Sequence, residues 1–277
     1  MVGKTNACGG SSADIFAFIR GTYPEGSTCT CSNGSVTLTA ADTSGTAVFK
    51  VPTYGTWTIT STLSTQSAST QVTIGSSERG TCGTFALSYR IPVEYQELQY
   101  IASTATGGQY VDTGYIYNSA YTYTIKFKVD TAAAGNVVLG AFGGDVPSMV
   151  TLPQNGEDGL QFMAGLGSSA IVSSSVTGIK TAVINSSSVV VNGTSYSMVT
   201  GYTGSLSMYL FAANYAGASA MWGGAVRIYS FKISYGSSDS VDYVPVKRKS
   251  DNKAGFWDVV NKRFITGVGT FTAGPNV

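Results

Sequence analysis

The sequence predicts an all-β protein of two domains, a small β-sandwich followed by a larger jelly roll. Apolar residues alternate with polar ones in short runs, and Gly, Asn, Asp and Ser separate the runs. Such alternation is typical of strands with one buried face, and closely spaced turn signals are typical of sandwiches. Charged residues make up only 11% of the 277 residues, while 17 Tyr and 12 Phe add to the strand-forming residues.

The first block, residues 14–90, is expected to hold short strands at Ile15–Arg20, Ser27–Cys31, Ser35–Thr39, Thr46–Val51, Thr56–Ser61, Ser69–Ile74 and Thr84–Tyr89. Glycine adopts a positive φ easily, which predicts turns at Asn33-Gly34, Ser44-Gly45 and Tyr54-Gly55. This strand density fits a small Ig-like or transthyretin-like sandwich. Residues 1–13 are rich in Gly and Ser and are interpreted as a flexible arm that orders only against a partner.

The second block, residues 91–277, has the strand density of a jelly roll of two packed antiparallel sheets. Asn192-Gly193 predicts a type I′ hairpin with Val189 opposite Tyr196. The best helical stripe in the chain is Pro92–Ile101. The strands expected here are Gln109–Tyr115, Tyr121–Val129, Val137–Phe142, Leu160–Ala164, Thr181–Asn185, Val189–Val191, Thr194–Met198, Ser205–Ala212, Ala225–Ile233, Val241–Val246, Gly255–Asp258 and Arg263–Ile265.

Charge and hydropathy disfavour nucleic acid and membrane as partners. The formal net charge is +1, and the densest basic cluster, Lys247 to Lys249, is too small for a nucleic-acid footprint. No apolar stretch has the roughly 20 residues that a membrane helix needs. Residues 1–14 lack the apolar core of a signal peptide. The chain is therefore expected to be made in a cytoplasm.

The four cysteines, Cys8, Cys29, Cys31 and Cys82, leave three alternatives open. Cys29 and Cys31 alternate on one expected strand, so their thiols point the same way. A four-thiolate zinc site, a disulfide and free buried thiols are all compatible with the sequence, but the spacing is not that of a zinc ribbon. Free thiols are the usual state in a chain without a secretion signal.

The sequence predicts that the protein is not an enzyme. It contains no histidine, which removes Ser-His-Asp and Cys-His systems and every His-containing metal site. A glycosidase on a jelly roll would use paired carboxylates, and none of the five Glu residues alternates with another acid along a strand. No resident cofactor is expected. Calcium is the one candidate, with loop oxygens from Asp112, Asp145, Asp251 and Asp258.

Residues 213–224 are expected to form a loop, and a ligand site is predicted in it. Asn214, Tyr215 and Trp222 combine aromatic rings with an amide, which is the chemistry that glycan binding requires. The alternative is that Trp222 folds back over the sheet as a lid on the core. Trp57 and Trp257 lie in strand patterns and are expected in the core.

Two stretches of the second block carry a family resemblance. Residues 91–101 (IPVEYQELQYI) with 108–114 (GQYVDTG), and the closing residues 226–233 (VRIYSFKI) with 242–251 (DYVPVKRKSD), resemble jelly-roll modules in virion proteins of phages that infect gut Firmicutes. The segments 255–258 and 269–275 agree with this likeness. Such modules look like the laminin-G and concanavalin A class of lectin-like folds.

The first block carries a second resemblance. Residues 22–34 (TYPEGSTCTCSNG), with 49–52 and 55–59, look like a small sandwich found on the same class of phage proteins. The resemblance implies a structural protein on a phage tail, neck or capsid, anchored by the first domain and presenting the second for adhesion to bacterial or mucosal glycans. The implied partners are other virion proteins and copies of the chain itself. A stabilising decoration or fibre protein and a bacterial surface adhesin are the alternatives.

Overall fold

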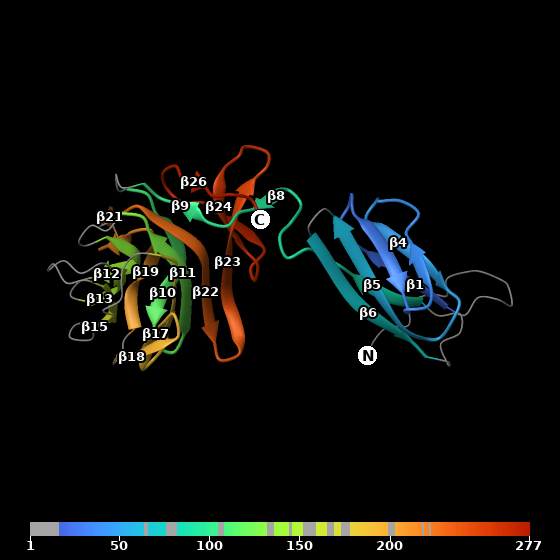
Figure 1. Cartoon of the computed structure of the whole chain (residues 1–277), viewed down its shortest axis with the longest axis horizontal. Coiled ribbons are helices and arrows are strands. Elements are labelled where there is room, and N and C mark those ends of the chain that lie inside the picture. The colour runs from blue at the N-terminus through green and yellow to red at the C-terminus, as the bar shows by residue number, and fades with distance from the viewer. Residues whose placement is uncertain are drawn as a thin grey trace. The chain divides into compact units, whose positions relative to one another are not determined.

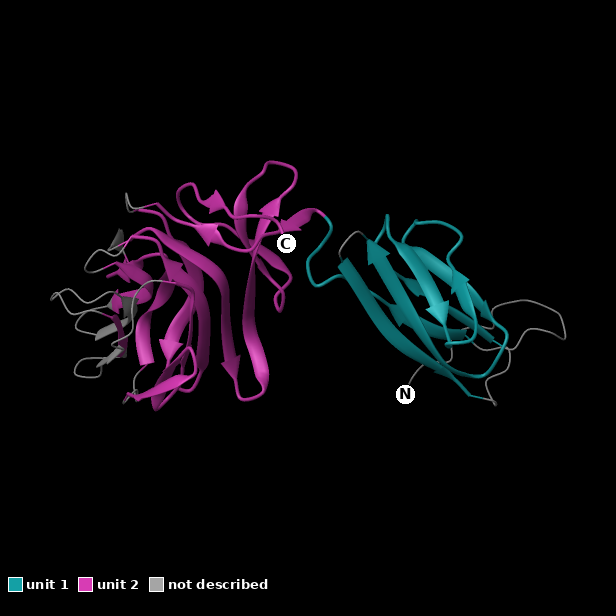
Figure 2. Ribbon diagram, viewed as in Figure 1, with its two compact units in different colours: residues 1–93 teal, residues 94–277 magenta. Residues whose placement is uncertain are grey.

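The computed structural model describes residues 17–63, 66–75, 82–104, 108–131, 136–143, 146–151, 159–164, 169–172, 178–198, 203–217, 219–221 and 223–277. The chain divides into two compact units, residues 1–93 and 94–277 (Figure 2). The boundary expected from the sequence follows residue 90, and the expected arm, residues 1–13, lies outside the described residues. Every regular element in the described ranges is a β-strand (Figure 1), which confirms the all-β prediction.

Unit 1 is a sandwich of two small sheets. One has the order β4-β1-β7 and the other β3-β2-β5-β6. In an Ig constant-type sandwich the first two strands share a sheet, whereas here β1 and β2 lie in different sheets and β1 pairs in parallel with β7. This order fits the transthyretin-like alternative. The strands are β1 (Ala17–Thr22), β2 (Thr28–Ser32), β3 (Thr37–Thr39), β4 (Thr46–Val51), β5 (Gly55–Leu63), β6 (Gln66–Ile74) and β7 (Cys82–Ala86).

The core of unit 1 follows the alternation of the sequence. Along β4 every second residue is buried, and the inward residues include Phe49 and Val51. Trp57 on β5 is fully buried, as predicted, and its indole nitrogen donates a 3.2 Å hydrogen bond to the carbonyl of Thr53. The remaining buried residues of this core are Ala17, Ile19, Tyr23, Cys29, Cys31, Ala47, Ile59, Ile74 and Phe85.

The cysteines differ in state. Cys29 and Cys31 are free thiols that point from β2 into the core, as the alternation predicts. Burial raises the pKa of Cys29 to about 11 and that of Cys31 to about 12. Cys82 is disulfide-bonded, which corrects the expectation of free thiols at that position. Cys8 lies outside the described residues.

Unit 2 contains two large sheets. The first has the order β10-β19-β12-β13-β14-β15, with β20 and β21 attached beside β12. Its strands are β10 (Val111–Asn118), β12 (Val137–Gly143), β13 (Val146–Thr151), β14 (Leu160–Ala164), β15 (Ser169–Val172), β19 (Thr203–Leu210), β20 (Ala213–Tyr215) and β21 (Ser219–Met221). Apart from the parallel pair β12–β20, its pairings are antiparallel.

The second sheet of unit 2 has the order β18-β17-β16-β11-β22-β23-β24-β25, with β8, β9 and β26 at its side. Its strands are β8 (Tyr95–Glu97), β9 (Ile101–Ala102), β11 (Thr122–Val129), β16 (Lys180–Ile184), β17 (Ser188–Val191), β18 (Thr194–Ser197), β22 (Val226–Tyr235), β23 (Ser238–Arg248), β24 (Ala254–Asp258), β25 (Arg263–Ile265) and β26 (Thr272–Ala273).

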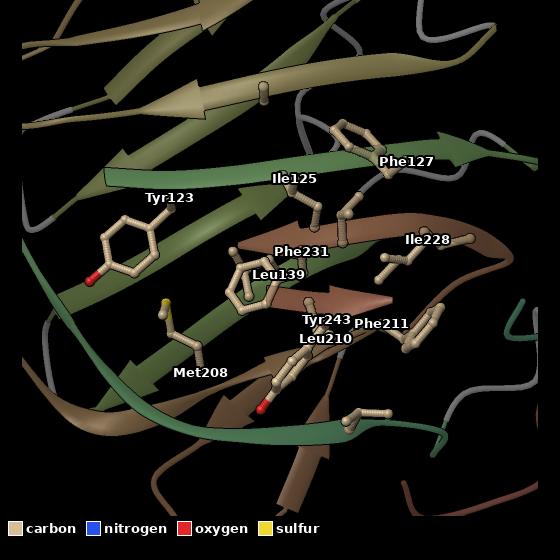
Figure 3. Close-up of a cluster of buried hydrophobic side chains, with 14 of the residues drawn as sticks. Tyr123, Ile125, Phe127, Leu139, Met208, Leu210, Phe211, Ile228, Phe231 and Tyr243 are labelled. Carbon is tan, nitrogen blue, oxygen red and sulfur yellow. The ribbon is translucent and has the colours of Figure 1, made fainter. Parts of the chain in front are cut away.

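Both large sheets contribute side chains to one core, shown in Figure 3. Tyr123 and Phe127 come from β11 in one sheet, and Leu139 and Leu210 come from β12 and β19 in the other. Two antiparallel sheets that enclose a shared core form the concanavalin A-like jelly roll that the sequence predicts. Trp257 is also buried, as expected.

The Asn192-Gly193 hairpin forms as predicted. Asn192 and Gly193 have φ angles of 49° and 89°, and Val189 lies opposite Tyr196. Two positive φ angles are the signature of the type I′ turn, whose twist matches that of the flanking strands.

The helical interpretation of Pro92–Ile101 is wrong. The segment contains the short strand β8, in which Tyr95 pairs with Arg248 of β23. The ring of Tyr95 lies 5.1 Å from that of Trp257 and 5.0 Å from that of Phe264, measured between centroids. Tertiary packing of one aromatic side chain thus outweighs a weak local periodicity.

We expect the thiols of Cys29 and Cys31 to resist alkylation by iodoacetamide in the native protein at pH 8. Their raised pKa values leave almost no thiolate, which is the reactive form. Mass spectrometry should find both thiols modified only after denaturation.

The raised pKa values of Cys29 and Cys31 also make the free energy of unfolding depend on pH. The unfolded thiols ionise near their ordinary pKa of 9, so the free energy of unfolding should fall as pH rises from about 9 towards 11. Rapid native alkylation of either thiol at pH 8 would contradict the assignment of both as buried and protonated.

Candidate functional site

A cleft of about 360 Å³ opens at one end of the unit 2 sandwich. Its walls come from β10 and β19 of one sheet and from β11 and β22 of the other, so it lies between the two sheets. Clefts of this size hold small-molecule ligands. It is lined by Gly114, Tyr115, Ile116, Asn118, Tyr121, Tyr123, Thr203, Gly204 and Ile233.

The pairing of β10 with β19 is irregular where β10 lines this cleft. The register of β10 against β19 shifts on both sides of Ile116. Gly114 has a φ of 72°, a conformation that favours glycine, and its N–H donates a 2.8 Å hydrogen bond to the Asp112 carboxylate. Buried and exposed residues nevertheless keep alternating along β10, and Ile116, which is 48% exposed, lies on its outward face between Tyr115 and the buried Tyr117.

The turn between β10 and β11 is held by Asn118 and Tyr123. The Tyr123 hydroxyl accepts a 2.7 Å hydrogen bond from the Asn118 N–H and donates one of 3.1 Å to the Asn118 carbonyl. The Asn118 side chain accepts a 2.9 Å bond from the N–H of Ala120. These bonds fix the floor of the cleft before any ligand arrives.

Tyrosine rings form the walls of the cleft and its rim. Tyr115 is anchored by its hydroxyl, which donates a 3.2 Å hydrogen bond to the carbonyl of Ser240. Tyr121 meets Tyr235 of β22 with 5.4 Å between ring centroids, and Tyr235 is 62% exposed. Exposed rings beside hydroxyl and amide groups suit a ligand that has both apolar faces and polar edges.

The cleft is electrostatically neutral. Its lining residues include no carboxylate, amine, guanidinium or thiol. Burial raises the pKa of Tyr123 above its ordinary value of 10, so this phenol stays protonated at physiological pH. The lining can therefore bind a neutral polar molecule, but it supplies no group poised to exchange a proton near pH 7.

The predicted site residues of the segment 213–224 occupy different environments. Asn214 is only 3% exposed, and its side-chain nitrogen donates a 2.9 Å hydrogen bond to the carbonyl of Ser207. Tyr215 is 38% exposed and stacks on Phe142 at 5.5 Å. The expectation that residues 213–224 form a loop is wrong, because β20 and β21 lie in this segment and pair with each other. Trp222 lies outside the described residues, so ligand contact there stays a prediction.

The calcium candidates are engaged in other contacts where they are described. Asp258 is fully buried and accepts a 2.7 Å hydrogen bond from the side chain of Asn261. A hydrogen bond from Arg248 is the main cause that lowers the pKa of Asp251 to about 2. Asp145 lies outside the described residues. Within the described ranges, no group of three or more Cys, Asp or Glu side chains is arranged to hold a metal ion.

The tyrosines of the cleft were missed at the level of sequence. Their signal is present in residues 115–123 (YIYNSAYTY), where four Tyr lie on the two sides of the turn between β10 and β11. Alternation alone assigns them to strand faces. It does not reveal that β10 is bulged or that Tyr235, far along the chain, joins them.

Comparison of the sequence with protein-family models and with curated protein sequences finds no match. Among solved structures, domains LG4–5 of the mouse laminin α1 chain are similar at 12% sequence identity and a TM-score of 0.31, over 83% of this chain and 86% of that one. A TM-score of this size carries no argument about function. The fold assignment therefore stands on the strand order. No helix in the described ranges is long and apolar enough to span a bilayer.

We expect Tyr123→Phe to lower the free energy of unfolding of unit 2 by about 1–3 kcal/mol, because it leaves the Asn118 N–H without its partner. Tyr196→Phe is the matched control, since Tyr196 packs against the same core and no hydrogen bond of its hydroxyl is found among the described residues. Urea denaturation measures both variants. Equal stability of the two would show that the hydroxyl of Tyr123 does not hold the turn.

Proposed function

We propose that the chain is a non-enzymatic structural protein on the surface of a phage particle and that unit 2 binds glycans through the cleft. The observation that carries the binding part is a neutral cleft walled by Tyr115, Tyr121 and Tyr123 and rimmed by Tyr235. Sugars present apolar C–H faces and hydroxyl edges, and this lining offers ring faces beside an amide and a hydroxyl. A neutral lining favours neutral oligosaccharides over anionic ones.

The particle part of the proposal is supported by the sequence resemblance of residues 91–101 and 226–251 to phage virion modules. In this proposal unit 1 attaches the chain to other virion proteins, and unit 2 adheres to bacterial or mucosal glycans. Virion proteins act in many copies, so a modest affinity at each cleft becomes useful avidity. The virion is accordingly the proposed location.

A second candidate is a decoration or fibre protein with a purely stabilising role. The observation that favours it is the long uncharged strand β6, which lies at the edge of its sheet and suits contacts between subunits. The two candidates differ in one respect, because only the first requires a saccharide in the cleft.

Antibodies raised against unit 2 should label the surface of particles of the virus that encodes this sequence. Particles without the protein would exclude both candidates and leave the bacterial adhesin.

We expect Tyr121→Ala and Tyr235→Ala each to weaken binding of a neutral oligosaccharide by about tenfold, equivalent to about 1.4 kcal/mol. Tyr121→Ala removes a ring that lines the cleft, and Tyr235→Ala removes the ring that contacts Tyr121. Tyr235 is largely exposed, so its loss should leave the fold intact. A panel of bacterial cell-wall and mucin oligosaccharides identifies the ligand, and calorimetry measures the affinities.

Tyr229→Ala is the control for these variants. Tyr229 also belongs to a tyrosine pair, with Tyr100 at 5.3 Å, but it does not line the cleft. Its removal should leave the affinity unchanged. Absence of saccharide binding across the panel, or equal losses in all three variants, would contradict a binding role for the cleft.

A further inference from the structure

Among the residues that the structure describes, no strand pairs with the outer edge of β6 in unit 1. β6 is the last strand in the order β3-β2-β5-β6, and Figure 1 shows it at the margin of its sheet. It pairs with β5 without interruption from Gln66, opposite Leu63, to Ile74, opposite Gly55. No backbone hydrogen bond is found on its other side among the described residues. A ladder of N–H and C=O groups is thus available to another strand.

The composition of β6 does not protect this edge. Natural proteins protect the edges of their sheets from pairing with other chains. They place Lys or other charges, a proline or a bulge in the edge strand, or they keep that strand very short. β6 has nine residues (QSASTQVTI), with no charge, no proline and an unbroken register. At the opposite edge of the same sheet, β3 has only three residues. Of the two edges, β6 is therefore the one suited to pairing.

We propose that two copies of the chain pair through β6 in an antiparallel manner, so that their two sheets become one continuous sheet across a two-fold axis. Isologous pairing of this kind satisfies the open edges of both copies at once and forms a closed dimer. The proposal concerns unit 1 alone and is independent of glycan binding by unit 2.

The sequence of β6 is compatible with pairing to itself. With Thr70 on the two-fold axis, Ser69 lies opposite Gln71 of the second copy and Ala68 lies opposite its Val72. Ser69 and Gln71 are exposed, whereas Ala68, Thr70 and Val72 are half-buried on the other face. This register therefore keeps the exposed face continuous across the axis and also joins the two half-buried faces.

Electrostatics does not oppose this arrangement. Like charges directly opposite one another destabilise a strand pair, and β6 contains no charged side chain. Polar pairs such as Ser–Gln and Thr–Thr can form cross-strand hydrogen bonds. Backbone hydrogen bonds provide most of the affinity, as in other cases of strand addition, and the alternating side chains decide which strands pair.

Sedimentation equilibrium of the full chain tests the proposal with paired lysine variants. The wild type should be a dimer. Ser69→Lys with Gln71→Lys places the two introduced ammonium groups of each copy directly opposite those of the other, and the dimer should weaken by at least about tenfold. Thr37→Lys with Thr39→Lys adds the same charge at exposed positions of β3, and this control should remain a dimer.

Disulfide cross-linking tests the register. Thr70→Cys places two thiols on the two-fold axis, where paired Cα atoms lie about 4.5–5.5 Å apart, which is within disulfide range. Mild oxidation should give a covalent dimer on a non-reducing gel. Ser67→Cys, three residues away on the same strand, faces Thr73 of the second copy, so its thiols lie about 20 Å apart and should not cross-link.

Two outcomes would overturn the proposal. One is a wild-type chain that stays monomeric at all concentrations, which is also the result expected if β6 instead receives a strand of another virion protein. The other is a lysine variant that keeps the wild-type dimer affinity while circular dichroism shows a native β spectrum. Neither outcome affects the glycan proposal, which depends on tyrosines of unit 2.

Discussion

The shared core of the two large sheets is the constraint on which unit 2 depends. Because side chains alternate along a strand, shifting the register by one residue would turn every buried residue outward. Two strands carry register shifts without losing the core. In β22 the register shifts between Ile228 and Ser230, and both Ile228 and Phe231 remain fully buried. In β10 the register against β19 shifts on both sides of Ile116, at the wall of the cleft, while buried and exposed residues keep alternating. The cleft therefore lies beside an irregular strand pairing, and Val111 and Tyr117 of the same strand still belong to the core.

Sequence alternation predicted the architecture but not these departures. The pair Val189–Tyr196 follows directly from Asn192-Gly193, because a two-residue turn fixes the register of its strands. Long-range pairings have no such local signal. The parallel pairing of β1 with β7, which distinguishes the transthyretin-like order, joins strands that are far apart in sequence. The strand β8 could likewise not be predicted from its own sequence, because Tyr95 packs against Trp257 and Phe264, which lie far along the chain.

The residue types of the candidate site could be predicted from the sequence, but their positions in the chain could not. Aromatic rings beside amides were expected at Asn214 and Tyr215, and the structure places the same combination around Asn118 and Tyr121. The side chain of Asn214 donates a hydrogen bond to the carbonyl of Ser207 and is buried. No local sequence pattern reveals this contact. The contact of Tyr121 with Tyr235 depends on the pairing of β11 with β22. A cluster built from two turns that are distant in the sequence becomes visible only when the sheets are assembled.

The central claim is that the tyrosine cleft of unit 2 binds a neutral saccharide. The 17 tyrosines of the chain make ring-labelled tyrosine a direct probe, because each ring reports its own surroundings. Nuclear magnetic resonance spectra should be recorded during titration with an oligosaccharide from cell wall or mucin. The account predicts shifts of Tyr115, Tyr121 and Tyr235, with no change at Tyr23 or Tyr89 of unit 1. Saturable shifts confined to other tyrosines, or none for any saccharide, would contradict it.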